Sequence, residues 1–188
     1  MAKVLEGPGM GLMKKWGIPV PQYVVVSSVD ELKKLADGNN WLSKATLVVK
    51  AHEAFGSRFK LGLVKVDLDL RGAQAAAKEM LGCQVGSITV TQVIVSEMVP
   101  HKEEYYAAVK STRDGAEVLV ANCGGIEVES NWDRVKKLTV EVGSVPTSEA
   151  LQKLAKEAGF SGATAEKVAD FAGKLFRVST TKMLNTSK

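Results

Sequence analysis

The chain has 188 residues, of which 45% are hydrophobic and 24% are charged, and its formal net charge is +4. This length supports one domain or two small subdomains around a hydrophobic core, and the composition is typical of a soluble globular protein. Acidic and basic residues alternate, so the sequence indicates no nucleic-acid surface. No apolar run reaches about 18 residues and the first residues lack the apolar core of a signal peptide, so we expect no membrane span.

The first half of the sequence predicts a β-α-β-β-α-β order, which indicates an α+β or α/β sandwich. A short helix is expected at 11–16, ended by Gly17, before prolines that forbid a helix. Ser28 and Glu31 form a capping box for the next helix, which should run to about residue 36. The remaining elements are strands at 24–26, 45–51 and 60–68, a helix at 71–82 ended by Gly82, and one long strand at 87–99.

A change of composition at Val99-Pro100-His101 marks a boundary in the chain. Beyond it, the alternating residues around Asp114-Gly115 predict a β-hairpin. The pair Gly124-Gly125 precedes residues that we expect to continue as a strand. A further strand is expected at 136–143, helices are expected at 148–158 and 164–175, and the last ten residues have no periodicity and should form a frayed tail.

The stretch VVKAHEAFGSRFKLGLVKV, residues 48–66, ends an apolar strand with Lys50 and continues into a small basic turn. Burying an ammonium group without a partner is costly, so a phosphate or a carboxylate is expected near Lys50, unless its side chain reaches solvent. Gly56 and Ser57 would let backbone N–H groups approach an anion, and Arg58 and Lys60 would add charge. The alternative is a plain hairpin with solvated charges. The segment has no Walker A spacing.

Five glutamates lie at the end of a predicted strand or within one, where a carboxylate could contact a ligand. Glu97 ends the long strand at the change of composition, a favoured position for a ligand. Glu103 and Glu104 precede an aromatic pair, and an inward-facing carboxylate there could accept hydrogen bonds from ribose hydroxyls. Glu127 and Glu129 would share one face of a strand and could approach a metal or a basic loop. Each of these carboxylates could equally be an exposed, solvated charge.

Histidine and cysteine indicate no catalytic or metal centre. His52 and His101 have no nucleophile and acid arranged around them, so we expect them at the surface or behind a site. Cys83 and Cys123 fit no metal spacing and are expected as small packed hydrophobes in a reducing cytoplasm.

Five segments are more specific together than any single residue: GLMKKWGIPVPQYVVVSSVDEL, LVVKAHEAFGSRFKLGLVKV, VIVSEMV, EEYYAAV and GGIEVE. Over roughly residues 10–178 the chain resembles the ATP-grasp β subunits of acyl-CoA synthetases, the group of succinyl-CoA synthetase and ATP-citrate lyase. Its variants AHEAFGSRFKLGLVKV and SEMVPHKEEYY are more similar to the ATP-citrate lyase and citryl-CoA synthetase branch. The resemblance implies an ATP-grasp fold with two α+β subdomains. Residues 21–99 would form the N-terminal type, and residues 1–20 with 100–188 would form an incomplete C-terminal type.

The resemblance also implies a role for each matching residue. Lys50 would contact the nucleotide phosphates, and Arg58 would do so from the phosphate loop. Succinyl enzymes have Gly-Arg-Gly where this chain has Ser57-Arg58-Phe59, which is a stiffer loop. The segment from Glu97 would read the adenine edge, and Glu104 would hold the ribose. The implied ATP- or ADP-binding set is Lys50, Gly56, Ser57, Arg58, Lys60, Glu97, Met98, Val99 and Glu104.

The chemistry that the resemblance implies involves a partner. The γ-phosphate of ATP would pass to a histidine on an α subunit that also holds the CoA site, so no catalytic residue is expected here. The full-length enzyme would join citrate to CoA, yielding citryl-CoA or acetyl-CoA and oxaloacetate, as suits reductive tricarboxylic-acid carbon fixation.

Relatives continue after KLFRV into an E-x-N-P-L motif and an acidic strand that hold Mg²⁺, whereas this chain has STTKMLNTSK. We therefore expect an N-terminal portion that binds nucleotide but, without its Mg²⁺ ligands, transfers phosphate poorly. Its unpaired sheet edge would favour a hetero-oligomer or homo-oligomer. A succinyl-CoA synthetase β subunit and a non-catalytic nucleotide-binding or assembly module remain as alternatives.

Overall fold

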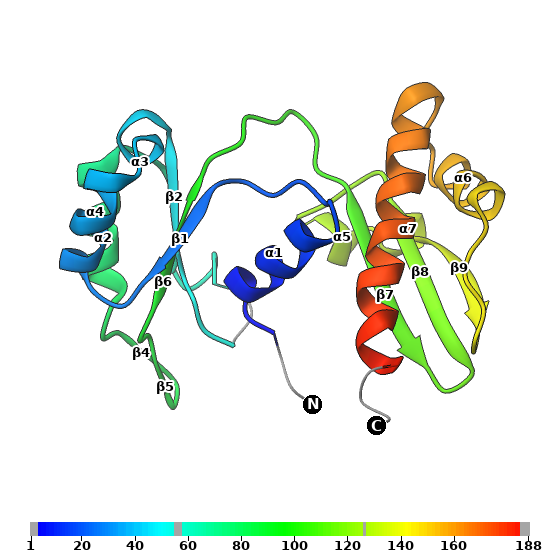
Figure 1. The fold of residues 1–188 in the computed structure, drawn as a ribbon, viewed down its shortest axis with the longest axis horizontal. Coiled ribbons are helices and arrows are strands. Elements are labelled where there is room, and N and C mark those ends of the chain that lie inside the picture. Colours follow the sequence, from blue (N-terminus) through cyan, green and yellow to red (C-terminus); the bar gives the residue numbers. More distant parts are fainter. Residues whose placement is uncertain (1–3, 55–57, 126, 185–188) are drawn as a thin grey trace. The chain divides into compact units, whose positions relative to one another are not determined.

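The computed structural model describes residues 4–54, 58–125 and 127–184, and the chain forms two compact units (Figure 1). Unit 1 comprises Met1–Lys14 and Pro19–Pro100, and unit 2 comprises Lys15–Ile18 and His101–Lys188. The sequence placed residues 1–20 with the second part of the chain. In the structure, most of the first helix, α1 (Glu6–Lys15), belongs instead to unit 1, because its first turn is bonded to residues of that unit.

Unit 1 is built on a four-stranded antiparallel sheet in the order β1-β6-β2-β3. Its strands are β1 (Tyr23–Val26), β2 (Leu47–Ala51), β3 (Val64–Leu68) and β6 (Val93–Glu97). The helices of the unit, besides α1, are α2 (Val29–Gly38), α3 (Trp41–Lys44) and α4 (Leu70–Met80). The β-α-β-β-α-β order predicted from the sequence is therefore present in the main sheet and its helices, and the short helix α3 and a small hairpin before β6 are additions to it.

Local capping explains where the helices of unit 1 begin. Ser28 Oγ accepts the Glu31 N–H at 3.1 Å, and Glu31 Oε2 in turn accepts the Ser27 N–H at 2.7 Å, so the predicted capping residues do cap α2. Asp69 caps α4 in the same way, with its Oδ1 2.7 Å from the Gly72 nitrogen.

The prediction of one long strand at 87–99 is wrong, because these residues form two strands that belong to different sheets. Residues Gln84–Val85 (β4) and Ile88–Thr89 (β5) form a two-stranded hairpin, with Gly86 at φ 61° in its turn. The N–H and the hydroxyl of Thr91 then both bind Glu53 Oε1 at 2.7 Å. Only after this interruption does β6 join the main sheet.

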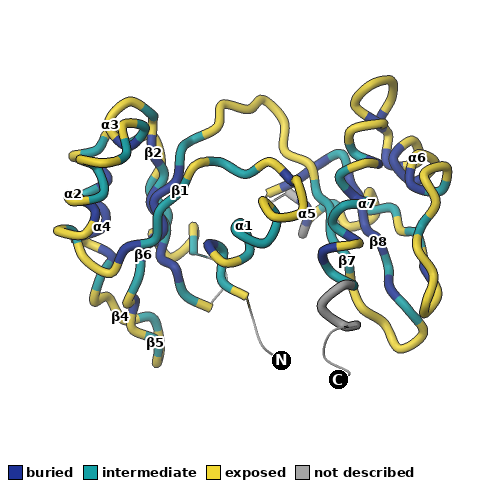
Figure 2. The backbone as a smooth tube through the Cα atoms, in the orientation of Figure 1, coloured by how far each residue is buried: buried dark blue, intermediate teal, exposed yellow. Residues whose placement is uncertain are grey.

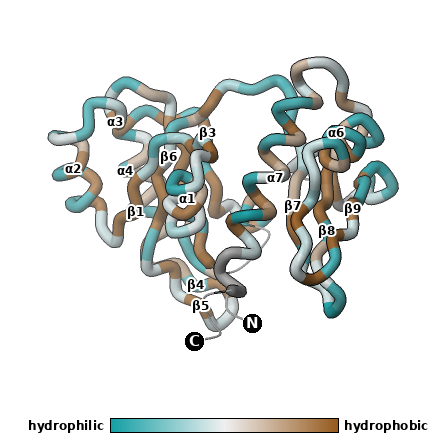
Figure 3. The backbone as a smooth tube through the Cα atoms, turned by 45° about the vertical axis from the view of Figure 1, so that its right-hand side comes forward, coloured by the Kyte–Doolittle hydropathy of each residue, from teal (hydrophilic) through white to brown (hydrophobic). Residues whose placement is uncertain are grey.

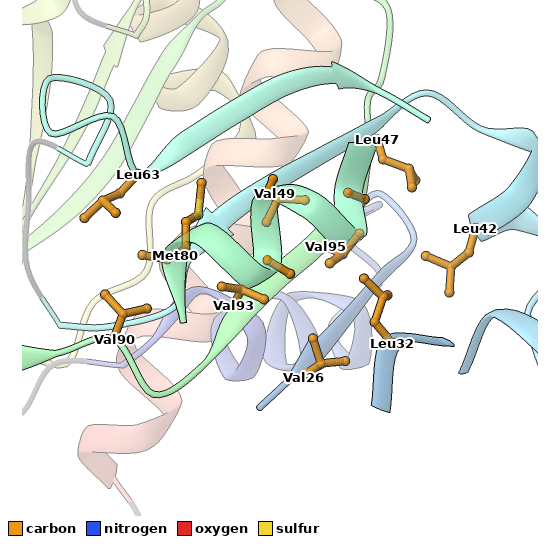
Figure 4. Close-up of a cluster of buried hydrophobic side chains, with 14 residues drawn as sticks. Val26, Leu32, Leu42, Leu47, Val49, Leu63, Met80, Val90, Val93 and Val95 are labelled. Carbon is orange, nitrogen blue, oxygen red and sulfur yellow. The ribbon is translucent and has the colours of Figure 1, made fainter. Parts of the chain in front are cut away.

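The core of unit 1 lies where α2 and α4 contact the strands (Figure 4). Figure 2 shows these buried positions in dark blue along the strands and the inner sides of the helices. Burying a Leu or Val side chain contributes about 1.5–3 kcal/mol, so this cluster dominates the stability of the unit. Its largest members include Val26, Leu32, Leu42, Leu47, Val49, Met80, Val90, Val93 and Val95.

Unit 2 has a three-stranded antiparallel sheet in the order β7-β8-β9, formed by Tyr106–Thr112, Gly115–Ala121 and Lys136–Glu141. The predicted hairpin is confirmed, since Thr112 pairs with Gly115 across its turn. Helices α6 (Ser148–Glu157) and α7 (Gly162–Leu184) contact this sheet and each other, and their apolar residues form a second core. In Figure 3 the strands of this sheet carry hydrophobic residues, and the tip of the hairpin is hydrophilic.

Two predictions for unit 2 are wrong. The residues after Gly124-Gly125 form a short helix, α5 (Glu127–Ser130), and not a strand, so the argument that Glu127 and Glu129 share one strand face does not hold. The expected frayed tail, residues 179–188, is helical as far as Leu184, where α7 ends, and residues 185–188 lie outside the described part of the structure. No helix of the described ranges is long and apolar enough to cross a membrane.

Candidate functional site

Lys50 lies on β2, the strand between β6 and β3. Leu47, Val49 and Ala51 alternate with it and are fully buried in the core, so the Lys50 side chain extends from the opposite face of the sheet. Its cross-strand neighbour on β6 is the buried Ile94. The Lys50 side chain is 26% exposed, so its ammonium group is only partly hydrated.

Glu6, the first residue of α1, joins the two cations that the sequence selected. One carboxylate oxygen of Glu6 lies 2.7 Å from Lys50 Nζ, and the other lies 2.9 Å from an Arg58 guanidinium nitrogen. A second guanidinium nitrogen of Arg58 donates to the carbonyl of Ala51 at 2.9 Å. Lys50 therefore has an anionic partner, as burial requires, and that partner is a carboxylate of the same chain.

The charge of this triad is fixed by its surroundings. Burial tends to raise the pKa of the Glu6 carboxyl, but the hydrogen bonds and charges of Lys50, and then those of Arg58, hold it below its ordinary value. Glu6 is therefore ionised at neutral pH, and the three side chains together carry a net charge of +1. This excess of positive charge is the electrostatic property that an anion site needs.

The backbone next to Glu6 makes two hydrogen bonds to side chains of unit 1. The Gly7 N–H donates to Nε2 of His52 at 2.9 Å, and the Tyr23 hydroxyl donates to the Gly7 carbonyl at 2.8 Å. A Cβ atom at Gly7 would lie 2.8 Å from Val25 Cγ2 and 3.1 Å from His52 Nε2, so only glycine allows this approach. His52 is only 3% exposed, so it lies below the surface, where it accepts the hydrogen bond from Gly7, the residue next to Glu6.

Not all of the predicted phosphate loop can be placed. Gly56 and Ser57 lie outside the described residues. Phe59 is 62% exposed and Lys60 is also exposed, so neither is held by packing in this state. Arg58 is the member of the loop that the structure joins to Lys50, through Glu6.

The predicted adenine segment is held by backbone hydrogen bonds. The N–H of Glu97 donates to the carbonyl of Gln22, and the N–H of Met98 donates to the carbonyl of Thr46, both at 2.8 Å. The side chains of Glu97 and Met98 are half-buried, and Val99 is 51% exposed. The backbone of the segment is therefore held to unit 1 where it leaves the sheet, and the exposed side chain of Val99 follows.

Glu104, the predicted ribose ligand, belongs to unit 2. It is exposed and lies 3.1 Å from Nε2 of His101. Its backbone and carboxylate lie against Gly124 and Gly125, where a Cβ atom would collide with them. A cavity of about 670 Å³ opens beside it, lined in part by Asn122 and Arg134, which are hydrogen-bonded at 2.7 Å. Gly124 and Gly125 thus leave space for Glu104, and they do not begin the strand that the sequence predicted after them.

Sequence reasoning missed Glu6, although it found both cations. The signal that was available is an acidic residue in the first turn of a helix, and the predicted helix began only at residue 11. The side chains of Glu127 and Glu129 are outside the described part of the structure, and within that part no group of three or more acidic, histidine or cysteine side chains could hold a metal ion.

The two-unit architecture, with a four-stranded antiparallel sheet in one unit and a three-stranded sheet with two helices in the other, belongs to the ATP-grasp class of folds. It superposes over 94% of the chain on ATP citrate lyase from Methanothrix soehngenii, solved with citrate and coenzyme A, with a TM-score of 0.78 and 25% identity over 43% of that chain. The chain belongs to the family of ATP-citrate synthase ATP-grasp domains, whose model matches residues 12–184.

Curated relatives agree with this assignment. ATP-citrate synthase alpha chain protein 1 of Arabidopsis thaliana is 40% identical over 130 residues, which is 67% of this chain and 31% of the relative. The succinate–CoA ligase (ADP-forming) subunit beta of Methanocaldococcus jannaschii is 26% identical over 182 residues, covering 94% of this chain and 48% of the relative. The chain therefore spans about a third to a half of the length of these relatives.

Proposed function

We propose that Lys50 and Arg58 bind the phosphate groups of ATP or ADP. The observation that carries this proposal is their convergence, from a strand and from a loop, on the two oxygens of one anion. A phosphate offers the same acceptor geometry as a carboxylate, and charge-assisted hydrogen bonds of this kind are the strong ones. Membership of an ATP-grasp family supports the assignment.

The other nucleotide contacts are proposed from the same family. Lys60 would add charge at the phosphates together with the backbone of Gly56 and Ser57, and the segment Glu97 to Val99 would contact the adenine. Glu104 would accept hydrogen bonds from the ribose. The fixed backbone of Glu97 and Met98 and the glycine pair behind Glu104 support these roles, because both keep a ligand group in a defined place.

In the full-length protein, we propose that this domain serves an ATP-dependent citrate–CoA ligase or ATP-citrate lyase of the cytoplasm. Bound ATP, with Mg²⁺, supplies the phosphoryl group, which would pass to a histidine of a partner subunit that also holds CoA. Lys50 and Arg58 would orient the phosphates and balance their charge. Citrate is favoured over succinate as the acid, because the plant ATP-citrate synthases are 37–40% identical and the succinate–CoA ligases 26–35%.

Calorimetric titration of the chain with ADP and Mg²⁺ tests the phosphate role. The substitution Lys50→Ala should weaken ADP binding by roughly 10- to 100-fold, since a hydrogen bond to a charged group contributes about 1.5–3 kcal/mol. Lys65→Ala is the matched control: Lys65 lies on the adjacent strand β3 and pairs with Glu79, so its loss should leave ADP affinity unchanged. Equal affinities for the unmodified chain and Lys50→Ala would refute the proposed role.

The acid substrate needs a second experiment with the partner subunit. Citrate and succinate are supplied in turn with ATP and CoA, and thioester formation is followed together with phosphorylation of the partner. Thioester from citrate alone supports the citrate branch, and thioester from succinate alone replaces it with the succinate branch. ADP binding without phosphorylation of the partner by this chain would leave the nucleotide role intact and make the chain a non-catalytic module.

A further inference from the structure

We propose that Glu6 is a positioning residue for the nucleotide phosphates: it holds Lys50 and Arg58 in one arrangement and stays bound to them when phosphate arrives. This inference rests on the proposed nucleotide role of the two cations. It assigns a function to α1, a helix that contributes none of the predicted ligand residues.

The hydrogen-bond donors of the triad are only partly used. Lysine has three N–H donors and arginine has five. Glu6 takes one from Lys50 and one from Arg58, and the Ala51 carbonyl takes another from Arg58. Two donors on Lys50 and three on Arg58 are left by these contacts. A phosphate can therefore join the cations without expelling the carboxylate.

Glu6 is also poorly placed to leave. Its neighbour Gly7 is bound on both sides, through its N–H to the buried His52 and through its carbonyl to Tyr23. Gly7 also lies close against Val25 of β1. These contacts fix the backbone that carries Glu6, so its carboxylate stays within reach of Lys50 and Arg58, and it can leave them only by rotating its own side chain and giving up both ion pairs.

The alternative is that Glu6 imitates a phosphate and competes with it. The two roles predict opposite changes in phosphate affinity when Glu6 is removed. A competitor blocks the site, so its removal should tighten phosphate binding. A positioning residue keeps two long cationic side chains ordered and close despite their mutual repulsion, so its removal should weaken phosphate binding even though a negative charge is lost.

The test is a calorimetric comparison of ADP with adenosine. Removal of Glu6 by Glu6→Ala should weaken ADP binding by about tenfold and leave adenosine binding unchanged, because adenosine has no phosphate. Glu6→Gln is the second variant, since the amide keeps the shape of the side chain and safeguards folding, and it should shift ADP in the same direction. Glu79→Ala removes another carboxylate that pairs with a lysine of the same sheet, and it should change neither affinity.

Three results would overturn the inference. Tighter ADP binding in Glu6→Ala or Glu6→Gln would identify a competing carboxylate. An equal loss for ADP and adenosine would show that Glu6 only supports the fold. No ADP binding by the unmodified chain would refute the proposed function, and this inference with it, whereas the first two results leave the phosphate role of Lys50 standing.

Discussion

Two glycines of α1 allow the docking of this helix to be tested by the same substitution in two places. Alanine favours a helix over glycine by about 1 kcal/mol, so Gly9→Ala, at a position with nothing within 4 Å of a new Cβ, should stabilise the protein by about 0.5–1 kcal/mol. Gly7→Ala has the same gain in helix propensity, but Val25 and His52 occupy the space that the new methyl group needs.

The cost at Gly7 follows from its neighbours. The new methyl group would lie 2.8 Å from Val25 Cγ2, and Val25 is a β-branched residue of a strand that is paired to Ile94, so it cannot easily move away. The first turn of α1 must shift instead, which weakens the Gly7–His52 hydrogen bond and the contacts of Glu6. Overpacking of this kind costs about 1–3 kcal/mol, and because the helical gain is the same at both positions, Gly7→Ala should be less stable than Gly9→Ala by about 1–3 kcal/mol.

Urea unfolding followed by far-UV circular dichroism measures this difference, with the free energy of unfolding obtained by linear extrapolation. ADP affinity provides an independent readout, because a shifted α1 also moves Glu6. The expected result is a loss of both stability and ADP affinity in Gly7→Ala, and of neither in Gly9→Ala. Equal stability of the two variants would show that α1 does not dock as described.

Three further predictions concern the titration of Glu6, the backbone at Gly125 and the accessibility of the two cysteines. Folding lowers the pKa of Glu6, so the stability that Glu6 contributes is fully present above its ordinary pKa and is lost as the pH falls through the lowered value. The difference in unfolding free energy between the unmodified chain and Glu6→Gln should therefore be largest above about pH 5 and should vanish on acidification. A difference that does not change with pH would contradict the triad. Gly125→Ala should destabilise the protein by about 1–2 kcal/mol in urea, because φ is 59° there, a left-handed conformation that strains any residue with a Cβ, whereas the exposed Glu104 carboxylate near the new Cβ can move aside; an unchanged midpoint would contradict this backbone conformation. In the native state a thiol reagent should modify the exposed Cys83 rapidly and the buried Cys123 only on unfolding, and equal rates would refute the burial of Cys123.

The parts of the fold that the sequence predicted are those governed by nearby residues. The capping pair Ser28 and Glu31 lies three residues apart, and the hairpin at Asp114-Gly115 depends on a tight turn. Such signals act within a few residues, so they can be recognised without knowledge of the tertiary structure. The β-α-β-β-α-β order follows from them together with the apolar periodicity of the strands.

The sequence predictions fail where contacts between residues far apart in the sequence determine the local structure. The long strand is interrupted near Thr91, whose N–H and hydroxyl bind Glu53, 38 residues earlier in the chain. The helix predicted to end at residue 175 continues through Phe176, which belongs to one buried cluster with Val118 and Val140 of the sheet. In both cases the contacting residues lie far apart in the sequence, so no local pattern could have indicated these contacts.

The candidate site shows the same limit in its chemistry. A lysine at the end of a buried strand needs an anionic partner, and in the structure Lys50 has one. The sequence did not indicate which anion this is, because Glu6 is 44 residues away and the helix that carries it was predicted to begin later. Since the folded chain supplies this carboxylate itself, the position of Lys50 alone is no evidence for a ligand. What favours a nucleotide is that Arg58 meets the same carboxylate, because one negative charge cannot balance two cations and an anion site remains.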